Sequence, residues 1–347
     1  MTELIVPRKT AYFAPQEGNL IKFSDNIPES LGQPLARVPN GPVTGLESGY
    51  RSGILGSDRL YKVKGCRPNT KPYGNEPKGS QTLSGAEYEV ERVFEIREIF
   101  LEELDTYPLI PRGFWVYDVL FRGEPNTATI YEIEGDTRLD EFLWWIEKDL
   151  PLVHVTDYEG INLLFRTLGI MTGRLVRIVH NHNRSWDRIV GDGNNSNSYP
   201  GNIVVYRNHS NKLNLGLVDV DDSQVFNPSV DGALMKETQK WELRFLMDVI
   251  LDYTVYSSSR VRKAKLISER LRGYTGQNID SEVSLSMDSF YHGMLRDSVA
   301  LGIEIGYNDP DTFVDEISLD SIIELREYIQ KLGKKFKRDF KQRALTK

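Results

Sequence analysis

Segments that favour β-strands and segments that favour α-helices lie in separate parts of this chain. Before residue 135 the strand candidates are "DRLYKVKG", "GFWVYDVLF" and "TATIYEIEG", with one long helix candidate among them. After residue 135 the pattern is mainly helical and contains a single hairpin. Such segregation is typical of the α+β class. We therefore expect an α+β fold with two lobes, in which residues 1–40 are an N-terminal extension, 41–134 a β-rich lobe and 135–347 an α-helical lobe.

The composition excludes several classes of protein. Hydrophobic residues make up 39% of the 347 residues, which is enough for a core, and the single cysteine, Cys66, excludes a disulfide framework or a thiolate zinc site. A formal net charge of −7 disfavours nucleic acid as a general partner. No signal pattern and no apolar run near the ~20 residues of a membrane span are present. We expect a soluble, cytoplasmic protein without a membrane partner.

The hairpin in the helical part ends in a cluster of acidic residues. Its strands, "NIVVY" and "LGLVDV", flank the polar loop "RNHSNKLN". Pairing about the middle of that loop places Asn202 opposite Asp219. Amide and carboxylate oxygens are ligands of hard cations such as Mg²⁺. Asn202 and Asp219 are therefore candidate metal ligands, with a solvated turn as the alternative, whereas Asp221 and Asp222 could cap the next segment.

The ordered set of motifs resembles the protein-kinase-like superfamily. "YPGNIVVY…LGLVDVDDS" is similar to the catalytic loop and metal-binding segment of aminoglycoside and choline kinase-like enzymes. "TATIYEIEGDTRLDEFL" resembles the fifth strand, hinge and following helix of a kinase, and "DRLYKVKG" and "GAEYEVERVFEI" resemble the strand and helix that carry the phosphate-binding lysine and its partner. The resemblance spans roughly Gly41 to Phe226. It implies a bilobal protein-kinase-like fold that uses ATP and Mg²⁺.

The resemblance also implies roles for individual residues. Lys64 would bind the phosphates and Glu87 would orient it, with Lys62 and Glu91 as the competing residues. "KVKGCRPNT" is in addition similar to selenoprotein O-like kinases, which transfer AMP to proteins. A glycine-rich loop would cover the phosphates and a hinge would hold adenine. The loop residues are Gly53 and Gly56, and the hinge residues are Glu132, Ile133 and Glu134.

The chain departs from the family at the catalytic base. Asn197 stands five residues before Asn202, where kinases of this type have Asp, and Gly201 stands where selenoprotein O-like enzymes have Asp. An amide cannot act as a base near neutral pH. The inserted loop "HNHNRSWDRIVGDGNN" offers substitutes in His182, Asp187 and Asp192, of which Asp192, between two glycines, is the first choice. A positioned base contributes about 10²–10⁴ in rate, so its loss slows phosphoryl transfer without necessarily abolishing it.

Two functions therefore stay open. One is a divergent phosphotransferase or AMP transferase that uses Mg·ATP and acts on a hydroxyl of a protein or small molecule. The other is a pseudokinase that serves as a nucleotide-binding interaction module. The C-terminal "EYIQKLGKKFKRDFKQRALTK" is basic in an acidic chain. We expect an amphipathic helix there, whose cations either complement the helix dipole or bind an acidic partner.

Overall fold

The computed structural model divides the chain into two compact units. Unit 1 comprises residues 1–137 and 216–223, and unit 2 comprises residues 138–215 and 224–347. Unit 1 thus extends slightly past the predicted lobe boundary at residue 134 and takes in eight residues that the sequence assigned to the helical lobe. The structure describes residues 10–13, 19–22, 43–48, 52–55, 60–64, 82–103, 112–121, 124–133, 135, 137–147, 158–186, 202–207, 210–220, 223–255, 281–312 and 317–345.

Unit 1 contains a seven-stranded sheet whose adjacent strands are antiparallel. In spatial order the strands are β1 (Thr10–Phe13), β3 (Val43–Ser48), β4 (Ser52–Leu55), β5 (Leu60–Lys64), β7 (Glu124–Ile133), β6 (Arg112–Phe121) and β2 (Asn19–Lys22). β6 and β7 form the hairpin that the sequence predicts. The mixture of this sheet with long helices confirms the α+β class.

One long helix, α2 (Leu83–Glu103), packs against β6 and β7 of unit 1. It begins after Thr82, whose hydroxyl oxygen accepts a hydrogen bond from Gly85 N–H at 3.1 Å and so satisfies one free amide of the first turn. Its buried apolar side chains recur every three or four residues, as an amphipathic helix requires. They are Ala86, Val90, Val93, Ile96, Ile99 and Phe100.

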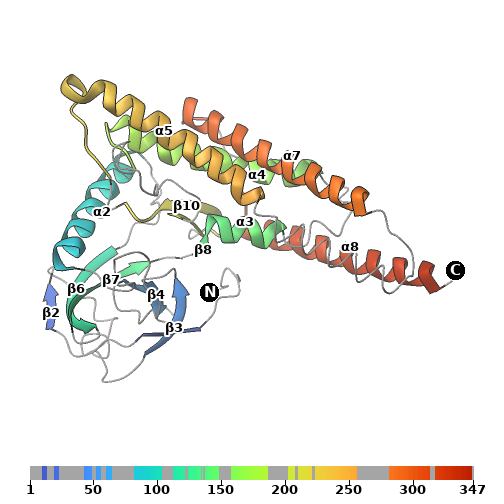
Figure 1. Cartoon of the computed structure of the whole chain (residues 1–347), viewed down its shortest axis with the longest axis horizontal. Coiled ribbons are helices and arrows are strands. Elements are labelled where there is room, and N and C mark those ends of the chain that lie inside the picture. The colour runs from blue at the N-terminus through green and yellow to red at the C-terminus, as the bar shows by residue number, and fades with distance from the viewer. Residues whose placement is uncertain are drawn as a thin grey trace. The chain divides into compact units, whose positions relative to one another are not determined.

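Unit 2 is built mainly of helices (Figure 1). They are α3 (Leu139–Glu147), α4 (Tyr158–Asn181), α5 (Pro228–Val255), α7 (Ser281–Asn308) and α8 (Leu319–Leu345). A short sheet has β9 (Ile203–Arg207) between β10 (Leu213–Leu217) and β8 (Thr137–Arg138). β9 and β10 are neighbouring strands, as the sequence predicts. Among the helices that the structure describes, none is long and apolar enough to cross a membrane.

Helices α4 and α7 lie side by side (Figure 1) and touch through glycines. A Cβ atom on Gly306 would lie 2.0 Å from the carbonyl oxygen of Ile170. A Cβ on Gly169, Gly173 or Gly302 would likewise lie 2.2–2.3 Å from a backbone oxygen of the facing helix. Real Cβ atoms do not approach so closely. The two backbones are therefore in direct contact, and only glycine fits at these four positions.

The start of α3 predicts a pH dependence of stability. Burial raises the pKa of the Asp140 carboxyl above its usual range, although Glu141 N–H donates to it at 2.9 Å. The stability that protonated Asp140 contributes is present below the unfolded pKa and is lost as pH rises through the folded pKa. We expect Asp140→Asn to unfold at a higher urea concentration than the parent at pH 7, with the difference vanishing near about pH 3. A variant that is less stable at pH 7 would contradict the effect of burial.

Candidate functional site

The candidate site in unit 1 is centred on the buried ammonium group of Lys64, the last residue of β5. Its Nζ lies 2.9 Å from Oε1 of Glu89 on α2, and both side chains are only 5% exposed. The same Nζ lies 3.3 Å from Oδ1 of Asp219, which follows β10 in the sequence. One buried cation is thus held by two carboxylates from segments that are distant in the sequence. Burying such a charge costs free energy unless it is paired in this way.

Both candidates for the phosphate-binding lysine are buried on one face of β5. Lys62 and Lys64 are 2% and 4% exposed, and residues two apart in a strand point to the same side of the sheet. In the register with β7, Lys64 lies opposite Thr129 and Lys62 opposite Tyr131. The face of β5 that carries Lys64 therefore holds two buried lysine side chains. At Lys64 the structure shows the two carboxylate contacts that define the site.

The carboxylate that α2 supplies is one that the sequence analysis did not single out. The sequence placed the partner of Lys64 at Glu87, or one helical turn later at Glu91, whereas the ion pair in the structure is with Glu89. Glu91 is exposed, and the side chain of Glu87 lies outside the described residues. The sequence does contain a signal that indicates Glu89. Glu89 stands three residues after Ala86 and four before Val93, so it lies on the apolar face of the helix, where a charge requires a partner.

Asp219 approaches Lys64 from an unusual backbone conformation. Its φ angle is 54°, in the left-handed region, which Asp tolerates better than most residues do. The residues on either side, Val218 and Val220, are buried, whereas the Asp219 side chain is 32% exposed. Backbone outliers of this kind cost about 1–3 kcal/mol and cluster at functional sites. Asp219 can therefore contact Lys64 and still offer carboxylate surface to a ligand.

The structure describes some of the other predicted site residues and leaves others outside its described part. Asn202 is 3% exposed and immediately precedes β9. It belongs to unit 2 and Asp219 to unit 1, so their predicted approach stays a prediction. Glu132 and Ile133 end β7, with Ile133 opposite Leu60 of β5. Gly53 lies in β4. The predicted residues that lie outside the described part of the chain are Gly56, Glu134 and Asp192.

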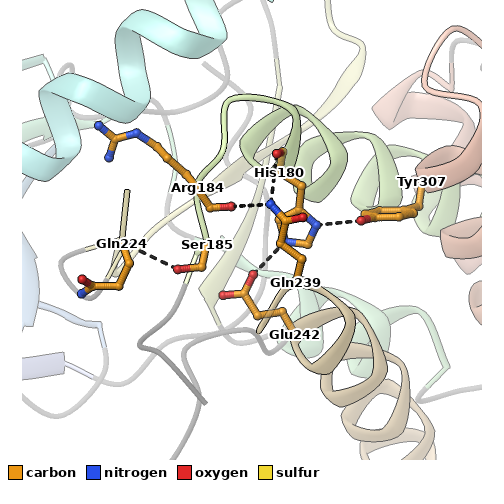
Figure 2. A network of polar contacts seen from close by, with 7 residues as sticks. All are labelled: His180, Arg184, Ser185, Gln224, Gln239, Glu242 and Tyr307. Carbon is orange, nitrogen blue, oxygen red and sulfur yellow. Dashed lines mark hydrogen bonds and ion pairs between the residues drawn. The ribbon is translucent and has the colours of Figure 1, made fainter. Parts of the chain in front are cut away.

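A second polar cluster, buried in unit 2, joins three helices (Figure 2). His180 of α4 lies with Nε2 2.7 Å from Oε2 of Glu242 on α5 and with Nδ1 2.9 Å from the hydroxyl oxygen of Tyr307 on α7. The His180 and Glu242 side chains are 1% and 0% exposed. Because the imidazole spans a carboxylate and a phenol, it connects the ends of α4 and α7 to α5.

The same cluster fixes the chain where it leaves α4. The side-chain amide of Gln239 donates to the carbonyl oxygens of His180 and Arg184, at 3.0 and 3.2 Å (Figure 2). Ser185 N–H donates to the Gln224 carbonyl at 3.0 Å, and Gln224 N–H donates to Ser185 Oγ at 3.3 Å. The inserted loop that offers a substitute base therefore begins at residues whose backbone is fixed by these hydrogen bonds.

Within the described ranges, no group of three or more His, Cys, Asp or Glu side chains is arranged to hold a metal ion. Asp219 fits the oxygen-donor chemistry of Mg²⁺, which commonly takes one or two carboxylates together with substrate phosphates.

Comparison with known proteins adds no family: no protein-family model matches the chain, and no curated protein matches it significantly. The residues of the site are therefore the basis for assigning a function.

Proposed function

We propose that this chain is a divergent member of the protein-kinase-like superfamily. It binds Mg·ATP at Lys64 and transfers a phosphoryl or AMP group to a hydroxyl of a protein or small molecule. The observation that carries the proposal is the contact of buried Lys64 with Glu89 on one side and Asp219 on the other. A strand lysine that is paired with a helix glutamate and lies near a metal-binding aspartate is the arrangement on which kinases depend.

Each residue would have a distinct role in this site. Glu89 holds the Lys64 ammonium in one position, from which it would bind phosphate oxygens. Asp219 and Asn202 would supply oxygen ligands for Mg²⁺, which when bound neutralises charge on the phosphates. Because such transfer depends mainly on positioning and electrostatics, a rigid buried cation would contribute even where the base is weak.

The pairing of β5 with β7 supports the proposed nucleotide position. Lys64 ends β5, and Leu60 at its beginning lies opposite Ile133, where the hinge is predicted. Four residues of strand separate these two places by roughly 13 Å. Adenine near Ile133 and phosphates near Lys64 would therefore lie along one pair of strands. The bilobal kinase-like architecture is part of the same proposal, and the sheet of unit 1 and the helices of unit 2 are compatible with it.

A nucleotide-binding pseudokinase is the second candidate function. Asn197 favours it, because this residue stands where an active kinase of this type has Asp. The Lys64, Glu89 and Asp219 contacts would serve nucleotide binding equally well in such a protein.

Thermal and chemical stability in the presence of Mg·ATP tests the proposed site. At a concentration of 100 times its dissociation constant, a ligand that binds only the folded chain adds about 2.7 kcal/mol. We expect this gain in the parent and its loss in Lys64→Met and Asp219→Asn. Asparagine also tolerates positive φ, so the second change removes charge without new backbone strain. Asp140→Asn, an identical change in α3, should keep the full gain.

Labelled ATP then separates the two functions. Transfer of label from the γ position indicates phosphoryl transfer, and transfer from the α position indicates AMP transfer. Binding without either transfer would favour the pseudokinase. If the parent gains no stability from Mg·ATP, the nucleotide site itself is wrong.

A further inference from the structure

A stripe of exposed cations lies along the last helix, α8. Lys331, Lys334, Lys335 and Arg338 are all exposed, and none of the four makes an ion pair with another described residue. At 100° per residue, their positions fall within an arc of roughly 100° on one side of the helix. We call these four residues the basic stripe. Residues 331–347 carry eight Lys and Arg against one Asp, so the other 330 residues carry a net charge of −14.

The first part of α8 is anchored to unit 2, so the stripe is held on a fixed helix. The amide N–H of Leu319 donates to the Asn211 carbonyl at 3.1 Å, and the Asn211 side chain donates to Asp320 at 2.6 Å. Six residues after Asp320, the Arg326 guanidinium lies 4.4 Å from the centre of the Trp145 ring and donates to the Trp145 carbonyl at 3.2 Å. The basic stripe begins five residues later.

The chain also carries a complementary stripe, on α2 of unit 1. Glu91, Glu98 and Glu102 are exposed, and Glu95 between them is half-buried and bonded to Arg92 at 2.6 Å. These four glutamates, which we call the acidic stripe, follow the spacing i, i+4, i+7, i+11. Lys331, Lys335 and Arg338 follow the first three of these positions, so the two helix faces match in spacing and are opposite in charge.

We propose that the basic stripe of α8 docks on the acidic stripe of α2 in a second copy of this chain. Every copy carries both stripes, so each copy offers the complement of the other's basic and acidic stripe, which is the self-complementarity that a two-fold pair requires. Exposed ion pairs contribute little individually and are screened by salt. The association is therefore weak and strongly dependent on ionic strength, with charge complementarity deciding the partner.

Sedimentation velocity of the full chain at two salt concentrations tests the proposal. In about 20 mM salt, where screening is weak, we expect dimers that increase with protein concentration, and in about 500 mM salt we expect monomers. Lys331→Glu/Lys335→Glu and Glu98→Lys/Glu102→Lys should each weaken the association at least about tenfold. An equimolar mixture of the two variants should recover dimers, because each supplies the complement of the other.

The control is Lys236→Glu/Lys240→Glu on α5, which makes the same change of charge at the same spacing on exposed residues. It should leave the dimer intact. Three outcomes would overturn the proposal: a parent that stays monomeric in low salt, a control that weakens dimers as much as the α8 variant, or a mixture that fails to recover them. A monomeric parent that instead binds a polyanion such as heparin through the basic stripe would assign α8 to a different partner.

Discussion

Replacing Gly306 with alanine is expected to lower the free energy of unfolding by about 3 kcal/mol or more. The new Cβ would lie 2.0 Å from the carbonyl oxygen of Ile170, well inside the sum of the atomic radii. That oxygen is part of the α4 backbone and cannot rotate away, so α4 and α7 must separate along their whole contact. Separation would loosen the packing on both sides of the glycines. Urea denaturation of the parent and the variant measures the loss.

Gly232 provides a matched control for this substitution. It lies in α5, and a Cβ atom there would meet nothing within 4 Å. Alanine at this position should leave stability unchanged or raise it by about 0.5–1 kcal/mol, because alanine loses less backbone entropy in a helix. The two changes are chemically identical, but only Gly306→Ala should lower the free energy of unfolding. A Gly306→Ala variant as stable as Gly232→Ala would show that the backbones of α4 and α7 are not in contact.

Replacing Glu89 with leucine should destabilise the chain by about 3 kcal/mol, the lower end of the range for a broken buried ion pair. The change leaves the buried Lys64 ammonium without its 2.9 Å partner, and Asp219, at 3.3 Å and partly exposed, compensates only in part. The additional change Lys64→Met should recover most of the loss, since it removes the uncompensated charge. Denaturation of the parent, the two single variants and the double variant yields the coupling free energy.

The control for this prediction is Glu91→Leu, two residues along the same helix and exposed. It should change stability by no more than about 0.5 kcal/mol. If Glu91→Leu were as costly as Glu89→Leu, or if the double variant were no more stable than Glu89→Leu, the ion pair would not be the cause. Glu89→Leu should also remove the gain from Mg·ATP, and this second readout links the ion pair to the proposed function.

Local patterns in the sequence determined much of this protein. Strand-type and helix-type segments are separated along the chain, and this separation predicts the α+β class that the structure confirms. The β6–β7 hairpin, the neighbouring strands β9 and β10, and the long helix α2 also follow from local periodicity. Such patterns succeed because the alternation of buried and exposed residues depends on the geometry of one element alone.

The role of Glu89 follows only in part from local patterns in the sequence. Helical periodicity in the sequence places Glu89 on the buried face of α2, but periodicity alone does not name its partner. The structure identifies that partner as Lys64 of β5 and adds Asp219, 155 positions further along the chain. Sequence comparison with a kinase pattern chose Glu87 instead, two residues away. A helix turns by about 200° over two residues, so a small misalignment changes the face completely.

The glycines of α4 and α7 likewise separate what the sequence shows from what only the tertiary structure shows. "LGIMTG" and "LGIEIG" can be read in the sequence, and glycine in a helix is unfavourable on its own. Only the tertiary structure decided that these two segments lie against each other, with backbone oxygens where side chains would otherwise be. The sequence by itself determined several elements, among them the β6–β7 hairpin and α2, and the face that α2 buries. Which buried faces meet was decided by tertiary packing, because it depends on the fit of surfaces that are more than a hundred residues apart.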